Sequence, residues 1–307
     1  MILLWGIETD TPLAMIGAAL ADAAVPVFFL DQQRVTETYF TIDFPGSPSG
    51  LLSDGVNEIA VETITAVYMR PFDTRRMARV ERAGPASRVW SDALILDDAL
   101  LCWCEMTPAT VINRPSAMGS NCSKPYQSML IQEHGFAVPD TLVTTDPVAA
   151  AEFWGLHGDV VYKSISGIRS IVSRLRPEHR ERLPDVAHAP TQFQEFIAGT
   201  DVRVHVVGDE LFASEIRSDA DDYRYASQLG SNVEITATDM PDKLSERCRS
   251  LVASLGLLVA GIDLRRTADG RWYCFEVNPS PGFSFYEQAT GQPIAQAIAN
   301  LLRLAHR

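Results

Sequence analysis

The sequence predicts an α/β layer followed by two lobes of mixed α and β structure. Three observations support this fold class. The first 30 residues alternate strand, helix and strand, residues 113–190 mix helical and β-rich stretches, and hairpins dominate after residue 191. A β-α-β opening indicates a parallel sheet, whereas consecutive hairpins indicate an antiparallel one. We therefore expect three domains, at residues 1–112, 113–190 and 191–307.

The N-terminal domain is predicted to be a Rossmann-like layer. Its expected strands are 2–5, 25–30, 65–69 and 110–112. Its expected helices are one that is capped by Asp10 and one over 87–106. The first turn, residues 6–10, lacks the glycine fingerprint of a dinucleotide site. Residues 41–58 are rich in Gly, Pro and Ser, so we expect a loop with at most one short strand.

Two arginines directly follow predicted parallel strands. Arg70 follows the strand at 65–69, and Arg114 comes shortly after the strand at 110–112. Ligands of open α/β sheets lie beyond the carboxyl ends of the strands. Both arginines are therefore candidate contacts for a substrate anion or carboxylate. The alternative is that each caps a strand end and pairs with a surface acid.

Charge and composition exclude several classes of function. The chain has 39 acidic and 26 basic residues, a net charge of −13 over 307 residues. Nucleic acid and anionic membranes need clustered cations, so neither is expected as a partner. Asp22 and Pro26 interrupt the apolar run at 12–30, which has no basic segment before it, so we expect a cytoplasmic protein. Cysteines and histidines are scattered, which excludes catalytic zinc.

The hairpin at 201–217 has apolar residues on one face and charges alternating with them on the other. With a three-residue turn, Arg203 would lie opposite Glu215, and Asp201 opposite Arg217. Cross-strand ion pairs on a solvent-exposed face would give the same pattern. This hairpin alone therefore leaves a functional face and a solvent face equally open.

The second hairpin, at 259–277, favours a functional face. In its simplest register Asp263 faces Cys274 and is diagonal to Glu276, and Asn278 projects to the same side as Glu276. Two carboxylates and a carboxamide are the oxygen ligands that hold Mg²⁺ together with substrate phosphates. Neighbouring acids would repel each other without a cation. The alternative is again a solvent-exposed face.

Two lysines are candidates for contacts with phosphate. Lys163 ends the apolar strand at 160–163 and precedes a short Ser/Gly loop, whose N–H groups can cap an anion. The loop contains one glycine, so the pattern alone is weak. Lys124, at the start of a predicted helix, is weaker still, because most lysines in that position are simply solvated.

These motifs together resemble the ATP-grasp superfamily, specifically its glutathione synthetase and RimK-like glutamate-ligase branch. The motifs that carry the resemblance are G-I-D-L at 261–264, F-E-V-N-P-S-P-G at 275–282, and Q-E-F-I at 194–197 followed by D-V-R at 201–203, with Lys163 upstream. The resemblance covers about Asn113 to Arg303. It implies an ATP-grasp fold with a Rossmann-like N-terminal domain, a small central lid domain and a C-terminal antiparallel-sheet domain.

The resemblance also implies roles for individual residues. The residues expected to bind ATP are Lys124 and Lys163 at the phosphates, Gln194, Glu195, Phe196 and Ile197 at the adenine hinge, and Asp201 at the ribose. Arg203 and Arg217 resemble the catalytic cations that neutralise the γ-phosphate or an acyl phosphate. Asp263, Glu276 and Asn278 resemble the Mg²⁺ ligands. We expect two Mg²⁺ ions, with Mn²⁺ as a possible substitute.

The implied reaction is an ADP-forming ligation. The γ-phosphate activates a substrate carboxylate as an acyl phosphate, and an amine or hydroxyl then displaces phosphate. The string K-S-I-S-G-I-R-S-I-V at 163–172 resembles the macrocyclases of graspetide pathways, although its loop is poorer in glycine than typical RimK-like loops. An amino acid and a ribosomal peptide remain open as substrates, and the family leads us to expect a homo-oligomer.

Two other function classes and one surface feature also stay open. The chain could be a non-catalytic nucleotide-binding sensor or partner subunit, or a kinase that stops at phosphoryl transfer. A complete metal-ligand set argues against the binding-only alternative. Arginines in the segment 70–82 could form a positive patch for an acidic peptide, and the alternative is an ordinary solvated basic run.

Overall fold

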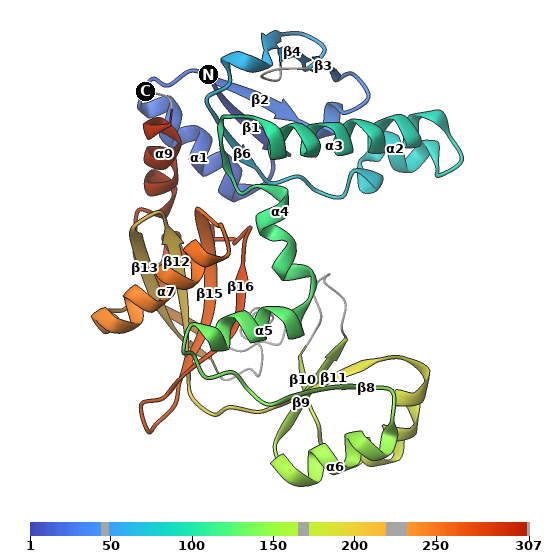
Figure 1. Cartoon of the computed structure of the whole chain (residues 1–307), viewed down its shortest axis with the longest axis vertical. Coiled ribbons are helices and arrows are strands. Elements are labelled where there is room, and N and C mark those ends of the chain that lie inside the picture. Colours follow the sequence, from blue (N-terminus) through green and yellow to red (C-terminus); the bar gives the residue numbers. More distant parts are fainter. Residues whose placement is uncertain (44–48, 165–171, 219–231, 306–307) are drawn as a thin grey trace.

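The computed structural model describes residues 1–43, 49–164, 172–218 and 232–305. Figure 1 shows the N-terminal domain at the top, an antiparallel sheet below it, and a smaller lobe at the bottom. The predicted order of an α/β layer followed by two mixed lobes is confirmed. No helix in the described ranges is both long and apolar enough to cross a bilayer.

The N-terminal domain contains a parallel sheet in the order β2-β1-β6-β7. Its strands are β1 Ile2–Gly6, β2 Val27–Asp31, β6 Ala66–Met69 and β7 Thr110–Ile112. Helix α1 (Thr11–Asp22) begins at the predicted cap, where the Asp10 carboxylate accepts a hydrogen bond from the Leu13 N–H at 3.0 Å. Helices α2 (Ala78–Ala83) and α3 (Arg88–Met106) follow β6. The predicted Rossmann-like layer is thereby confirmed.

The prediction of a loop over residues 41–58 is wrong. The segment contributes to a three-stranded antiparallel sheet formed by β3 Tyr39–Asp43, β4 Ser49–Ser53 and β5 Glu58–Ala60. Leu52 is fully buried in the same apolar cluster as Trp103 of α3, and Phe40, Ile42 and Ile59 pack against this cluster. The Gly, Pro and Ser residues interrupt the alternation of apolar and polar residues that would indicate a strand. Packing on α3 compensates for their low strand propensity.

The bottom lobe of Figure 1, called the lid lobe below, has a four-stranded sheet in the order β10-β9-β11-β8. Its elements are β8 Thr141–Thr144, α6 Pro147–His157, β9 Val160–Ser164, β10 Ser173–Arg174, a 3₁₀ segment Pro177–His188 and β11 Thr191–Glu195. Strand β11 begins just after the predicted boundary at residue 190, yet it pairs with β8 and β9. The lobe thus extends to about residue 195.

The C-terminal domain is a five-stranded antiparallel sheet in the order β14-β13-β12-β15-β16. Its strands are β12 Thr200–Val207, β13 Glu210–Ser218, β14 Val233–Ala237, β15 Val259–Arg266 and β16 Trp272–Asn278. Its helices are α7 Asp242–Ser254, α8 Ser284–Thr290 and α9 Ile294–Leu304, and α4 Pro115–Met118 and α5 Lys124–Glu133 lead into it from the N-terminal domain. Ile131 of α5 packs in the same core as β12 and β15, so this helix belongs with the C-terminal sheet.

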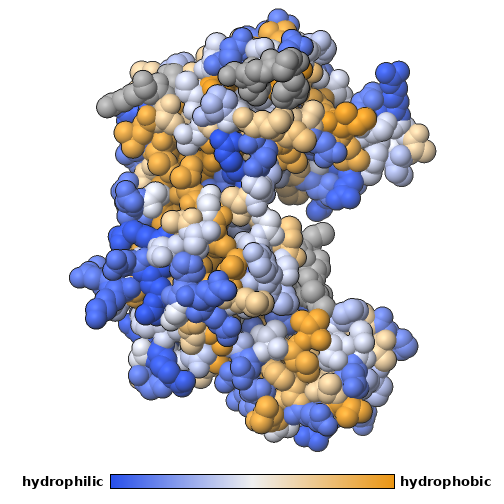
Figure 2. Space-filling model, in the orientation of Figure 1, coloured by the Kyte–Doolittle hydropathy of each residue, from blue (hydrophilic) through white to orange (hydrophobic). Residues whose placement is uncertain are grey.

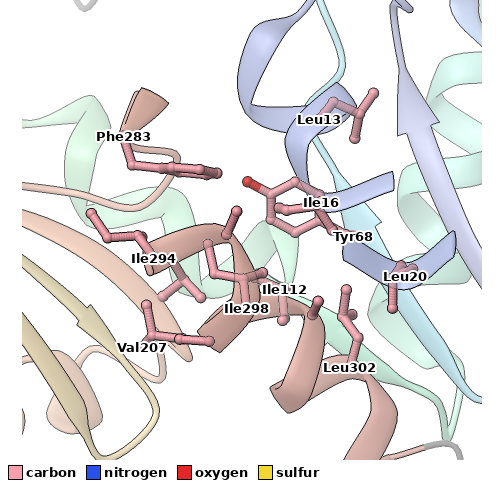
Figure 3. Close-up of a cluster of buried hydrophobic side chains, with 14 of the residues drawn as sticks. Leu13, Ile16, Leu20, Tyr68, Ile112, Val207, Phe283, Ile294, Ile298 and Leu302 are labelled. Atoms are coloured by element: carbon pink, nitrogen blue, oxygen red, sulfur yellow. The ribbon is translucent and has the colours of Figure 1, made fainter. Parts of the chain in front are cut away.

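A shared core fixes the N-terminal domain against the C-terminal one. Helix α9 lies alongside α1, and the two termini lie close together in Figure 1. Figure 3 shows Ile298 and Leu302 of α9 among Leu13 and Ile16 of α1, with Tyr68 of β6 in the same cluster. Burial of this apolar surface holds the ends of the parallel strands at a fixed position relative to the antiparallel sheet.

Candidate active site

A row of charged side chains crosses three neighbouring strands of the C-terminal sheet. Arg203 on β12 is the register partner of Asp263 on β15, which in turn is the partner of Glu276 on β16. Partners in antiparallel strands project from the same face of a sheet. Asn278, two residues after Glu276, lies on that face as well. The structure therefore brings the three predicted metal ligands and Arg203 together.

The register of this second hairpin differs from the predicted one. Asp263 lies opposite Glu276 and not opposite Cys274, a difference of two residues. Leu264 already pairs with Cys274, one residue beyond the predicted register, and an irregularity between Asp263 and Leu264 adds the second residue. A β-bulge of this kind re-aims side chains in an otherwise regular ladder. The shift turns a diagonal relation between the two carboxylates into a direct one.

Each of the two carboxylates is paired with a predicted phosphate-binding cation. The Arg203 guanidinium donates to Asp263 Oδ1 at 2.5 Å, and its side chain is only 7% exposed. The Lys124 ammonium contacts Glu276 Oε1 and also donates to Asn121 Oδ1 at 2.8 Å. A buried cation needs such a partner to offset the cost of its desolvation. The site therefore places two adjacent carboxylates between two cations.

Gly261 provides the space that Arg203 occupies. A Cβ atom built on Gly261 would lie 2.1 Å from Arg203 Nη2 and 2.8 Å from the Cβ of Pro281. Only glycine leaves room there, since both distances are far below van der Waals contact. We did not assign Gly261 a role from the sequence. Its signal is a glycine inside an apolar strand, which often marks the close approach of another group.

Helix α5 holds the edge strand that carries Glu276 and Asn278. The buried Gln127 side chain hydrogen-bonds to both backbone groups of Val277, at 2.8 and 3.0 Å. Lys124 lies three residues earlier, on the same face of the helix. Sequence reasoning noted Lys124 but missed Gln127. The spacing of three between a lysine and an amide side chain is the available signal.

Arg217 does not join Arg203. The first hairpin has a two-residue loop, because Val207 pairs with Glu210, and the predicted three-residue turn is wrong. Gly208 adopts a positive φ of 55°, as tight hairpin loops require. A shift of one residue reverses the face of every side chain on one strand. Arg217 thus lies on the face opposite Arg203, where its mostly exposed side chain donates to Glu215 at 2.9 and 3.0 Å.

Asp201, the predicted ribose ligand, is bound by another arginine. Arg265 donates to both of its carboxylate oxygens, at 2.7 and 3.0 Å, and also to the Ile197 carbonyl at 2.8 Å. Asp201 and Arg217 line one open pocket of about 410 Å³. The predicted ribose ligand and the predicted catalytic cation therefore line one pocket even though they lie on opposite faces of the hairpin.

The predicted adenine hinge connects the lid lobe to the C-terminal sheet. Gln194 and Glu195 end β11, Gln194 Nε2 donates to Thr141 Oγ1 at 3.0 Å, and the Phe196 N–H donates to the Asp159 carbonyl. The Arg174 guanidinium lies 3.6 Å from the centre of the Phe196 ring. This cation–π contact keeps the hinge aromatic in place.

Lys163 lies where the sequence predicts it, near the end of β9 and opposite Gln192 of β11. The loop from Ser164 to Ser170 was expected to cap a phosphate. Its residues 165–170 lie outside the described part of the chain. The predicted role of Lys163 therefore rests on its strand position.

The two candidate substrate arginines have different surroundings. Arg70 donates to Asp10 at 2.7 Å and, across the domain interface, to Ser280 Oγ at 3.1 Å and the Pro281 carbonyl at 2.9 Å. Arg114 donates to four backbone carbonyls at and beyond the end of α3. Arg70 therefore borders the strand that carries the predicted metal ligands, whereas Arg114 caps a helix end.

Two buried polar residues that the sequence did not single out support the loop at 279–282. Asn113 Nδ2 donates to the carbonyls of Val259 and Pro279, at 2.7 and 2.6 Å. His205 is fully buried beneath this loop, with Nε2 3.4 Å from the Gly282 carbonyl oxygen. Burial, followed by the charge of Arg203, lowers the pKa of His205 well below its usual value, so the ring is neutral.

A second group of possible metal-binding side chains lies in the lid lobe. Ligand atoms of Asp140, His157 and Glu195 lie within 4.8 Å of one another. Asp140 is largely exposed, and exposed acidic groups often gather without an ion. The oxygen donors of Asp263, Glu276 and Asn278 match the preference of Mg²⁺ better, because Mg²⁺ favours carboxylate and carbonyl ligands over imidazole.

The sequence also matches a known family model. Residues 123–302, or 180 of 307, match the model described as a RimK-like ATP-grasp domain. This range starts one residue before Lys124 and ends after Asn278. It therefore contains the whole row of charged side chains described above.

Curated relatives are ligases and synthases. Beta-citrylglutamate synthase B of Danio rerio is 30% identical over 71% of this chain and 56% of its own length. The probable alpha-L-glutamate ligase of Cellvibrio japonicus is 31% identical over 63% of this chain and 67% of its own length. The chain spans a little over half the length of several of the curated relatives it matches.

Solved structures extend the likeness to the N-terminal domain. The ATP-grasp ligase PsnB, in complex with a phosphomimetic variant of its minimal precursor, Mg and ADP, is 25% identical with a TM-score of 0.84, covering 100% of this chain and 98% of that one. The macrocyclase MdnC of Microcystis aeruginosa, bound to its precursor peptide MdnA, is 20% identical with a TM-score of 0.85 and covers 99% of both chains. The MdnC likeness shows the fold alone.

Proposed function

The chain belongs to the RimK-like ATP-grasp family, and from this premise we propose that it is an ADP-forming ligase that joins a carboxylate to an amine or hydroxyl of a peptide. The observation that carries the proposal is the row formed by Arg203, Asp263 and Glu276, with Lys124 against Glu276. A protein that only bound nucleotide would have no need of all three predicted metal ligands beside Arg203 and Lys124.

The donor set fits a magnesium site. Asp263, Glu276 and Asn278 offer oxygen atoms from one face of two paired strands, and Mg²⁺ prefers such ligands. Lys124 and Arg203 each lie against one of the two carboxylates, which supports the view that this acidic pair attracts positive charge. When bound there, Mg²⁺ supplies further positive charge to the transferring phosphoryl group.

The residues of this chain mainly position the reactants. Lys124, Lys163 and Arg203 would hold the phosphates of ATP, and the hinge at 194–197 would hold the adenine. Transfer of the γ-phosphoryl group to a substrate carboxylate gives an acyl phosphate and ADP, and attack by an amine or hydroxyl then releases phosphate. Fixed cations lower the barrier because they are already oriented toward the charge that develops on the phosphoryl oxygens.

A peptide substrate is favoured over a free amino acid by the extent of the similarity. The precursor-bound structure of PsnB matches the whole chain, including the N-terminal domain, at 25% identity and a TM-score of 0.84, which supports a peptide substrate. The number of metal ions, the use of Mn²⁺, the catalytic role of Arg217, the substrate contacts of Arg70 and Arg114, and a homo-oligomeric state stay predictions.

The test is Mg²⁺-dependent ADP release from ATP, with and without pools of acidic peptides and of amino acids, and with hydroxylamine present. Hydroxylamine captures an acyl phosphate as a hydroxamate, whereas it does not react in this way with a phosphate ester. We expect ADP and hydroxamate to rise together with a peptide pool. ADP without hydroxamate would favour a kinase, and no ADP with any pool, despite tight ATP binding, would favour a binding protein.

A further inference from the structure

A group of exposed arginines lies on the N-terminal domain and has no part in the site described above. Arg75 and Arg76 are in a 3₁₀ turn, Thr74–Arg76, and Arg79 and Arg82 are in α2. Residues 71–83 contain four arginines and two acids, a local net charge of +2 in a chain of net charge −13. Together with the exposed Phe72, these four arginines are called the arginine surface below.

Acidic neighbours neutralise the arginine surface only in part. Arg75 pairs with Asp73 at 2.7 Å. Arg79 pairs with Glu37, whose carboxylate already accepts two hydrogen bonds from Arg34. One carboxylate is therefore shared by two guanidinium groups, which leaves an excess of positive charge.

Two of these arginines form no ion pair within the described residues. The Arg76 guanidinium lies over the Phe72 ring, 5.5 Å from its centre, and Arg82 Nε donates to the Ala78 carbonyl at 2.9 Å. Guanidinium groups carry five N–H donors in a planar array that matches the two oxygens of a carboxylate. Arg76 and Arg82 therefore keep donors that can bind an incoming carboxylate.

A rigid support holds this surface in shape. Phe72 is 46% exposed, yet its backbone is held at both ends by the buried Gln32 side chain, which accepts from the Phe72 N–H and donates to its carbonyl, each at 2.7 Å. Gln32 also donates to Thr74 Oγ1 at 2.5 Å. An exposed aromatic ring on a fixed backbone, stacked under an arginine, offers a contact that loses little entropy when it binds a peptide.

The arginine surface is continuous in sequence with the edge of the active site. Arg70, two residues before Phe72, contacts Ser280 and Pro281 in the loop that follows Glu276 and Asn278. In Figure 1, α2 and α3 extend away from β6, above the lid lobe. Figure 2 shows a hollow between the N-terminal domain and the lid lobe, and hydrophilic residues lie on the edge of the N-terminal domain that borders it.

We propose that the arginine surface binds an acidic segment of the peptide substrate and leads its carboxylates toward Asp263 and Glu276. This inference rests on the proposed function, in which a carboxylate is the group to be activated. A chain of net charge −13 repels an acidic peptide at long range, so a local positive surface is needed to bring that peptide in. The occupant is thus defined by its chemistry: several side-chain carboxylates within one extended segment.

The experiment compares two double variants with the natural protein. R76Q/R82Q removes the two guanidinium groups of this surface for which the described part of the chain provides no ion pair. The control, R247Q/R249Q, removes the same charge from α7 of the C-terminal domain, where both arginines bond to backbone carbonyls. The probes are fluorescein-labelled hexaglutamate and hexaglutamine, and binding is measured by fluorescence anisotropy at low and at high salt.

We expect R76Q/R82Q to bind hexaglutamate at least about threefold more weakly than the natural protein or the control, with the difference shrinking at high salt. Equal loss in both double variants would overturn the proposal, as would equal binding of hexaglutamate and hexaglutamine by the natural protein.

Failure of the proposed function gives a different result. Hydroxamate formation would then be absent with every peptide, while hexaglutamate binding would still depend on Arg76 and Arg82. Conversely, if hydroxamate forms but R76Q/R82Q binds hexaglutamate as well as the natural protein does, the arginine-surface proposal is wrong and the proposed ligase function stands.

Discussion

The side chain of Gln127 forms hydrogen bonds with both the N–H and the C=O of Val277, 150 residues later in the chain. Val277 separates the two predicted metal ligands on β16, the edge strand of the C-terminal sheet. The outward backbone groups of an edge strand have no neighbouring strand to pair with. Gln127 takes the place of that strand and fixes the positions of Glu276 and Asn278.

Replacing Gln127 by Ala should lower the free energy of unfolding by about 2–3 kcal/mol, because it leaves two buried backbone groups without partners. ADP formation should fall as well, since Glu276 and Asn278 lose their support. Chemical denaturation and an ADP assay measure the two effects. Q132A, on the exposed side of the same helix, is the control and should be neutral. An unfolding free energy for Q127A within about 0.5 kcal/mol of the natural protein would contradict this account.

A methyl group at Gly261 should displace Arg203. The added Cβ would meet Arg203 Cζ at 2.5 Å, so G261A should cost about 1–3 kcal/mol of stability and lower ADP formation more than that loss explains. The matched control is G282A, whose Cβ would have no heavy atom within 4 Å other than those of residue 282 and its two chain neighbours. If both variants retain full activity, Gly261 is not needed to seat Arg203.

Neutralising either predicted metal ligand should abolish turnover and leave the chain folded. Glu276→Gln and Asp263→Asn keep the shape of each side chain and one oxygen acceptor, but they remove the negative charge that attracts Mg²⁺. We expect ADP formation to fall at least about 100-fold. Circular dichroism checks the fold, and E210Q, on the exposed start of β13, is the control. Unchanged ADP release in both variants would rule out the metal assignment.

Stability should depend on pH through Asp97. Burial, with smaller contributions from Asp98 and Asp73, raises the pKa of this carboxyl from 3.8 to about 6. Between these values the folded chain holds more protons than the unfolded chain, so stability falls as pH rises from about 4 to 6. The full shift corresponds to about 3 kcal/mol, and partial exposure reduces this to about 1–2 kcal/mol.

The Asp97→Asn variant should therefore be about 1–2 kcal/mol more stable than the natural protein at pH 7 and equal to it at pH 4. Urea denaturation at a series of pH values measures the difference. Asp22→Asn, at an exposed position at the end of α1, is the control for the loss of one carboxylate charge. A stability gain of D97N that is the same at pH 4 and pH 7 would argue against titration of Asp97 as its cause.

The order of strands and helices was largely predictable, because the sequence signals for each element lie within that element and its immediate neighbours. The Asp10 cap, the strands that end before Arg70 and Asn113, and the helix from Ser87 all lie within a few residues of their predicted positions. Periods of two and of 3.6 residues, with capping residues, depend only on neighbours in the chain. The short strands at 39–60 were missed because their stability comes from packing on α3.

Both hairpin registers were predicted wrongly, and with different consequences. A two-residue loop at Gly208 placed Arg217 on the opposite face from Arg203, and an irregularity after Asp263 brought that residue directly opposite Glu276. A sequence constrains a register only through its turn and its apolar pattern. One residue of difference in a loop is enough to exchange the two faces.

The amino-acid sequence specifies which chemical groups are present and in what order: two carboxylates and an amide in one hairpin, lysines upstream, and arginines after strands. Which of these groups meet depends on how the chain folds. The fold paired Lys124 with Glu276, seated Arg203 against Gly261, and set Arg70 against the loop at Ser280. Local patterns arise from bonded neighbours, whereas contacts between residues 60 to 210 positions apart depend on how separate elements pack, and no short stretch of sequence encodes that packing.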